Sequence, residues 1–98
     1  MSLGGRGVIS VLANLVPAKV SDMMHACLEG DYAKAGRLQV EVLPLIQALF
    51  SETSPIPVKE AMNQMGMQVG QCRLPLTTMQ EKTKQNLISV MQSYGLIA

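Results

Sequence analysis

The chain has 98 residues, of which 48% are hydrophobic and 15% are charged, against the roughly 25% charged residues of an average soluble domain. A domain of this size buries only about 60–70% of the surface that its unfolded chain exposes, which argues against a large enclosed active site. The net charge is +1, with two tyrosines, one phenylalanine and no tryptophan, so the sequence offers neither a basic surface nor a base-stacking platform, and nucleic acid is excluded as a partner.

No apolar run approaches the ~20 residues that a membrane span requires. The N-terminus also lacks the charged and apolar regions of a leader peptide, so a cytoplasmic protein without membrane contact is expected. Cys27 and Cys72 form no Cys-x-x-Cys pair, and His25 is the single histidine, which predicts reduced, buried thiols and no metal or other cofactor. Residues 1–3 are interpreted as a cloning remnant and take no part in the fold prediction.

The first predicted element is a strand over Val8–Ala13. Glycines precede this β-branched run, and Asn14 and Pro17 follow it. Its apolar residues are nearly continuous, as in a strand that is covered on both faces in a parallel sheet. One such strand cannot form a sheet, so the chain is interpreted as incomplete.

Two helices are predicted next. From Pro17 the apolar spacing becomes that of an amphipathic helix, which Gly30 is expected to end. Asp31 can cap a second, longer helix that continues to about Phe50, with a kink rather than a break at Pro44. The residues predicted to be buried in these helices are Val20, Met23, Met24, Cys27, Leu28, Ala35, Leu38, Val42, Leu45, Ile46 and Leu49.

Two shorter helices complete the prediction. After a turn-rich connector, Pro57 suits the first turn of a third helix that Gly66 ends. Following an irregular loop over residues 68–76, Thr78 and Glu81 match a capping box that would open the last helix. The predicted buried stripes are Val58, Ala61, Met62 and Met65 in the third helix, and Leu87, Val90, Met91 and Tyr94 before Gly95 in the last.

The chain has five lysines, and a lysine acts as a Schiff-base nucleophile when burial keeps its amine uncharged. Lys19, Lys34, Lys82 and Lys84 lie on polar helical faces or near helix starts, where a solvated ammonium is expected. Lys59 lies in a stiff Ile-Pro-Val-Lys segment, but an ion pair or a contact with a carbonyl is favoured over catalysis.

Other polar residues also have ordinary explanations. His25 has only Asp22 nearby in sequence, which favours a locally hydrogen-bonded ring over a metal ligand or a triad member. Gly4–Gly7 precedes a strand instead of leading from a strand into a helix, which excludes a phosphate cradle. Ser10 and Asn14 would point into an active site only if the predicted strand belonged to a barrel. The eight methionines are explained as pliable core or interface residues.

Five short motifs, in order, resemble those of one enzyme family. They are Gly5–Val11 with Asn14, Leu28–Ala35, Ser54–Lys59, Arg73–Leu76 and Tyr94–Leu96. The first is similar to the eighth strand and following turn of dihydrodipicolinate synthases, in the N-acetylneuraminate lyase superfamily of class I aldolases, and the others to the C-terminal domain of these enzymes. The family more often has asparagine at the place of Ser54, which is a mild departure because both residues suit a turn.

The resemblance implies a mostly α chain: the last strand and helix of a (β/α)8 TIM barrel over residues 4–29, then a C-terminal helical domain over residues 30–98. It implies a parent lyase, a cytoplasmic homotetramer that condenses pyruvate with aspartate semialdehyde through a lysine Schiff base in lysine and diaminopimelate biosynthesis. Such a barrel needs about 250 residues. The family's catalytic lysine and tyrosine would therefore lie upstream, and no catalytic residue is predicted here. The resemblance implies a substrate-binding role for one residue, Ile9. It would line the pyruvate pocket and present its backbone carbonyl towards the reacting centre.

The leading hypothesis is thus an inactive C-terminal piece of this amino-acid biosynthesis enzyme, which self-associates through Val8–Leu15 because the covering barrel faces are absent. One alternative is a free-standing helical interaction module, favoured by the apolar composition and the methionine-rich stripes. Another is a piece of a related pyruvate-dependent aldolase such as N-acetylneuraminate lyase.

Overall fold

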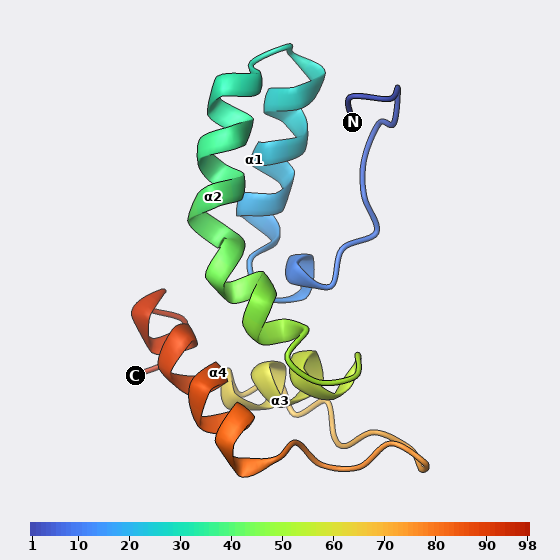
Figure 1. Ribbon diagram of the computed structural model, residues 1–98, viewed down its shortest axis with the longest axis vertical. Coiled ribbons are helices and arrows are strands. Elements are labelled where there is room, and N and C mark those ends of the chain that lie inside the picture. The colour runs from blue at the N-terminus through green and yellow to red at the C-terminus, as the bar shows by residue number, and fades with distance from the viewer. The chain divides into compact units, whose positions relative to one another are not determined.

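A computed structural model describes all 98 residues, and its regular structure is entirely helical (Figure 1). The elements are a 3₁₀ helix, η1 (Leu12–Asn14), and the α-helices α1 (Pro17–Leu28), α2 (Tyr32–Leu49), α3 (Ile56–Gln64) and α4 (Glu81–Ser93). The prediction of a mostly α chain is confirmed. None of these helices combines the length and the apolar character needed to cross a membrane.

The chain divides into two compact units, Met1–Leu43 (unit 1) and Pro44–Ala98 (unit 2). The division falls inside α2, at the proline whose ring removes the N–H that would donate to the carbonyl of Val40. α2 runs through this proline without a break, as predicted, and the accompanying kink stays a prediction. The predicted boundary between residues 29 and 30 concerns the domains of a longer enzyme and also stays a prediction.

The predicted strand over Val8–Ala13 does not form in this chain. Gly5–Ser10 has no regular structure and no backbone hydrogen bond to any other residue, and Val11 already has helical dihedral angles, with φ −59° and ψ −43°. A strand needs a neighbouring strand to pair its N–H and C=O groups, and this chain supplies none. Local bonds are made instead, because the Ala13 N–H donates to Ser10 Oγ at 3.3 Å and opens η1.

In unit 1, α1 lies beside the first part of α2 (Figure 1). The Lys19 ammonium is paired with the Glu41 carboxylate across the two helices. The buried stripe of α1 is narrower than predicted, since Ala26 is buried whereas Leu28 is exposed and Met24 and Cys27 are half-buried. Residues at i, i+3 and i+6 face the core of the unit, and the flank of this stripe remains accessible. The core consists of Leu12, Leu15, Val16, Val20, Met23, Ala26, Ala35 and Val42.

Three helices end in the same hydrogen-bonding pattern, as the predicted glycine stops require. After α1, the Gly30 N–H donates to the carbonyl of Cys27 at 3.1 Å, and the Asp31 N–H donates to the carbonyl of Ala26 at 2.8 Å. This is the Schellman motif, in which the residue after the C-cap takes a left-handed conformation; here Glu29 is the C-cap and Gly30 has φ +80°. The same pair of bonds follows α3 at Gly66 and α4 at Gly95.

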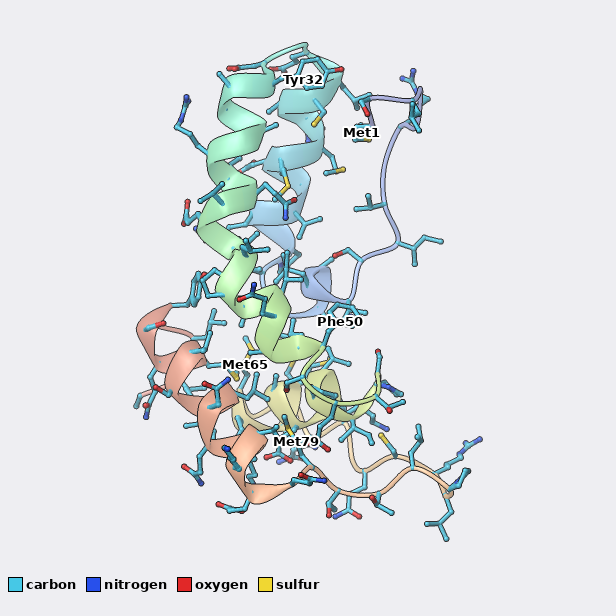
Figure 2. The ribbon with its side chains drawn as sticks, viewed as in Figure 1. Met1, Tyr32, Phe50, Met65 and Met79 are labelled. Carbon is cyan, nitrogen blue, oxygen red and sulfur yellow. The ribbon has the colours of Figure 1, made fainter.

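In unit 2, α3 packs against α4, and the Lys84 ammonium lies 3.2 Å from a Glu60 carboxylate oxygen between them. The predicted stripes are confirmed at their centres, with Leu87 and Met91 fully buried, while Val90 and Tyr94 are half-buried. The other buried residues of the unit are Leu45, Ala48, Leu49, Pro57, Val58, Ala61 and Met79, the last of which is labelled in Figure 2.

The predicted capping box of Thr78 and Glu81 is wrong. α4 begins after Gln80, and no side chain of its own first turn caps it. The cap comes from the connector before α3, where Glu52 accepts the Gln80 N–H at 3.0 Å and also a hydrogen bond from the Thr83 hydroxyl. A carboxylate at this position satisfies an orphan N–H and opposes the positive end of the helix dipole, which a threonine hydroxyl does less well.

Candidate functional site

Ile9 lies in the irregular N-terminal segment of unit 1, which runs past α1 without joining it through hydrogen bonds (Figure 1). Its side chain is fully exposed, at 109% of the reference value, while that of the preceding Val8 is 54% exposed. The N–H and carbonyl of Ile9 have no partner in the chain. Both the side chain and the carbonyl of Ile9 are therefore available to a group that the chain does not contain.

Ser10 and Asn14 are occupied by local structure instead of forming a site with Ile9. Ser10 Oγ accepts the Ala13 N–H, and Asn14 Nδ2 donates to the carbonyl of Val11 at 3.0 Å. These bonds fix the one turn of 3₁₀ helix that separates the N-terminal segment from α1. The two side chains shape the backbone after Ile9 through these local bonds.

Three lysines have side-chain bonding partners within the fold. Lys19 is paired with Glu41 and Lys84 with Glu60. The Lys59 ammonium donates to the carbonyl of Gln71 at 2.9 Å, which confirms the predicted carbonyl contact. A lysine amine that is held by a carboxylate or a carbonyl is not free to attack a substrate.

The histidine and the two cysteines do not form a catalytic or metal-binding site. His25 Nδ1 lies 2.9 Å from the carbonyl of Ser21 and 3.3 Å from its hydroxyl, one helical turn earlier, so the predicted locally hydrogen-bonded histidine is confirmed. Cys27 and Cys72 are free thiols in different units and are half-buried rather than buried. No group of three or more histidine, cysteine, aspartate or glutamate residues is placed to hold a metal ion.

A small cleft lies between α3 and the loop that follows it. Asn63 holds this loop through two bonds, accepting the Val69 N–H at 2.9 Å and donating from Nδ2 to the carbonyl of Gly70 at 2.9 Å. Lys59 supplies the third bond, to the next residue of the loop. The cleft has a volume of about 90 Å³, which is below the roughly 300 Å³ of the smallest drug-sized pockets.

A larger and more apolar groove lies on unit 1. It has a volume of about 400 Å³ and is open to solvent. Its walls come from α1, from the first turns of α2 and from the N-terminal segment, and Figure 2 labels two of its residues, Met1 and Tyr32. The lining residues are Met1, Val8, Met23, Met24, Cys27, Tyr32, Ala35, Gly36 and Gln39.

The sequence did not predict two residues whose side-chain hydrogen bonds connect separate segments of unit 2. Asn63 follows predicted stripe residues of the third helix, and no local pattern indicates that it would bind a loop six and seven residues later. Glu52 lies 28 residues before the N–H that it caps, a distance at which sequence spacing has no predictive value. Both roles depend on tertiary placement.

Known proteins match nearly the whole length of this chain. A family model described as the dihydrodipicolinate synthetase family matches residues 1–94. The 4-hydroxy-tetrahydrodipicolinate synthase of Thermoanaerobacter pseudethanolicus is 57% identical over 97 residues, which are 99% of this chain and 33% of that protein.

Solved structures agree with this match. Dihydrodipicolinate synthase from Aquifex aeolicus superposes with a TM-score of 0.94 at 41% identity, over 97% of this chain and 32% of that one. The chloride-inhibited enzyme from Acinetobacter baumannii, complexed with pyruvate, superposes with a TM-score of 0.90 at 36% identity, over 97% of this chain and 33% of that one. The chain thus spans about a third of the length of the relatives that it matches.

Proposed function

Because this chain belongs to the dihydrodipicolinate synthetase family, we propose that it forms the C-terminal third of a lyase that condenses pyruvate with aspartate semialdehyde through a lysine Schiff base. The reaction belongs to lysine and diaminopimelate biosynthesis, and the parent enzyme is a cytoplasmic homotetramer. The observation that carries the proposal is the family match along nearly the whole chain. The pyruvate complex of the Acinetobacter baumannii relative supports pyruvate as one substrate.

Within this proposal, Ile9 forms one wall of the pyruvate pocket and presents its backbone carbonyl to the reacting centre. Its full exposure and its unpartnered carbonyl support this role, because both groups are free to face a substrate held by the rest of the enzyme. The contribution of Ile9 is geometric, since an isoleucine side chain transfers no proton and forms no covalent bond.

The isolated chain is inactive in this proposal. Its support is the environment of the lysines, among which Lys19 and Lys84 are ion-paired and Lys59 is bound to a carbonyl. The groups that a Schiff-base aldolase needs, a lysine amine kept uncharged and a proton relay, would come from the upstream two-thirds of the parent enzyme.

The test is to incubate the chain with pyruvate and borohydride, which reduces any Schiff base to a stable adduct, and then to measure the mass. We expect no adduct at any lysine beyond the background that a lysine-containing control protein gives. A stoichiometric adduct at a single lysine would contradict the proposal, and peptide mapping would then identify the nucleophile.

The isolated chain also self-associates in this proposal, through Val8–Leu15 and the surface beside it. Support comes from Val8 and Ile9, two consecutive apolar residues that are exposed in a segment whose backbone groups are unpaired.

A free-standing helical interaction module is the second candidate function. The observation that favours it is the open apolar groove of unit 1, whose methionines would adapt to a partner. The genomic reading frame separates the two candidates. A start codon at Met1 with no barrel encoded upstream would favour the module, and an upstream barrel in the same frame would favour the lyase.

A further inference from the structure

Ser10 joins Ile9 to the regular structure of unit 1. The Ala13 N–H donates to Ser10 Oγ at 3.3 Å and not to the Ser10 carbonyl, which has no partner in the chain. A bond to that carbonyl would begin the 3₁₀ helix one residue earlier, because each N–H in such a helix bonds to the carbonyl three residues before it. The serine hydroxyl therefore sets the point at which η1 begins.

The turn after this serine is fixed by hydrogen bonds and by the core. The carbonyl of Val11 accepts two bonds from Asn14, one from the backbone N–H at 3.1 Å and one from Nδ2 at 3.0 Å. Three apolar side chains anchor the turn in the core of unit 1, those of Leu12 (5% exposed), Leu15 (4%) and Val16 (8%). The turn is thus a stable support for the residue that precedes it.

The direction of the Ile9 carbonyl depends on this support. The carbonyl belongs to the planar peptide unit between Ile9 and Ser10, so it moves together with the Ser10 nitrogen. The Ser10 hydroxyl reaches the Ala13 N–H only when its Cβ is directed at the turn, and this also orients the Ser10 backbone. No backbone hydrogen bond holds the peptide from the other side, since the backbone groups of residues 5–8 are unpaired.

We propose that Ser10 is a positioning residue for the lyase reaction, because its bond to the Ala13 N–H directs the Ile9 carbonyl. The inference rests on the proposed function, in which that carbonyl faces the reacting centre, and it adds the group that holds the carbonyl in place. The match to the Aquifex aeolicus enzyme, with a TM-score of 0.94 over 97% of this chain, supports the same backbone path in a family-length enzyme.

A purely structural role for Ser10 makes a different prediction. If the hydroxyl only stabilised η1, its removal would lower stability and leave the kinetics of the folded enzyme unchanged. A misdirected carbonyl would instead lower kcat in an enzyme that still folds and binds pyruvate, because a small displacement of a group at the reacting centre slows the chemical step.

The first measurement uses the dilute 98-residue chain. In a trans peptide the N–H of residue 10 points opposite to the Ile9 carbonyl, so its residual dipolar couplings in nuclear magnetic resonance report the direction of that carbonyl. Ser10→Ala should change these couplings, because the Ala13 N–H can then bond only to the backbone carbonyl of residue 10. Ser10→Thr should preserve them, since threonine keeps the hydroxyl.

The second measurement is turnover in a family-length enzyme. The Thermoanaerobacter pseudethanolicus synthase is prepared with the region that matches this chain replaced by this chain. With pyruvate and aspartate semialdehyde, Ser10→Ala should lower kcat by about tenfold or more, while KM for pyruvate changes by less than about threefold. Ser10→Thr should retain kcat within about threefold of the unsubstituted enzyme.

Two further variants serve as controls. Ser51 also makes a local bond, from its Oγ to the carbonyl of Ala48 at 2.8 Å, but it lies in unit 2, so Ser51→Ala should leave kcat and KM unchanged. Asn14→Ala should lower kcat less than Ser10→Ala does, because the Val11 carbonyl keeps its bond from the backbone N–H of residue 14. Urea titration of each variant measures stability separately.

The possible failures are distinguishable. Unchanged couplings in Ser10→Ala, or an equal loss of kcat in Ser10→Ala and Ser10→Thr, would overturn the inference. Full turnover by Ser10→Ala would also overturn the inference alone, because the unsubstituted enzyme would still support the proposed function. An unsubstituted enzyme that folds but turns over neither substrate would refute the proposed function, and the inference that rests on it.

Discussion

Glu52 caps a helix of unit 2 from outside that helix. Its carboxylate accepts the Gln80 N–H at 3.0 Å and the Thr83 hydroxyl, and so completes the first turn of a helix to which it does not belong. The first N–H groups of a helix have no partner within it, and the positive end of the helix dipole favours a negative charge there. Thr78, which the sequence assigns to this task, makes no such bond.

Glu52→Ala should lower the free energy of unfolding by about 1 kcal/mol, which is the usual cost of losing an N-terminal cap. Thr78→Ala is the matched control, and its effect should stay within about 0.5 kcal/mol because the hydroxyl caps nothing. Urea titrations followed by far-ultraviolet circular dichroism measure both values. A larger loss for Thr78→Ala than for Glu52→Ala would contradict the observed cap.

At the scale of elements, the helices were predictable because their signals are local. Pro17 and Gly30 delimit the first helix through a missing N–H and a left-handed turn, both of which are properties of single residues. The strand over Val8–Ala13 was not predictable in the same way. Its residue pattern suits a strand, but a strand exists only where a partner strand is present, and this chain supplies none.

Pro44 gives a prediction for α2. The ring removes one hydrogen bond inside a helix that continues on both sides of it. Pro44→Ala should therefore raise the free energy of unfolding by about 1–3 kcal/mol, because alanine restores the bond and the Pro44 side chain is exposed.

A second substitution separates helix propensity from the effect of the proline ring. Gly36→Ala, in the same helix, meets nothing within 4 Å and should raise stability by about 1 kcal/mol at most. Thermal denaturation of both variants provides the comparison. A destabilised Pro44→Ala beside a stabilised Gly36→Ala would show that the packing of this chain depends on the bend that a proline introduces.

At the scale of the whole molecule, the candidate functional site is harder to predict from the sequence than the helices are. The role proposed for Ile9 rests on resemblance to a family, because nothing in the pattern of one predicted strand says which of its residues faces a substrate. The groove beside Val8 was not predicted at all. Its lining residues, Met24 and Cys27, were assigned to a buried stripe, and only the packing of α1 against α2 leaves them half-exposed.

The exposed N-terminal segment predicts the solution behaviour of the isolated chain. Its mean mass in light scattering should rise above that of a monomer as concentration increases, because Val8 and Ile9 gain cover by association. Ile9→Asp should shift the chain towards the monomer, while Leu74→Asp, which alters an exposed leucine of unit 2, should not. A strict monomer at high concentration, with Val8–Leu15 ordered, would contradict this prediction.

The cap on α4 also has a consequence for the order in which the chain is made. Glu52 precedes Gln80 by 28 residues, so at synthesis rates of about 5–20 residues per second the acceptor leaves the ribosome a few seconds before the helix that needs it. The costly first turn of α4 therefore forms with its acceptor already synthesised. A circularly permuted chain that placed α4 ahead of the connector would retain the contact in the finished fold but would reverse this sequence of events.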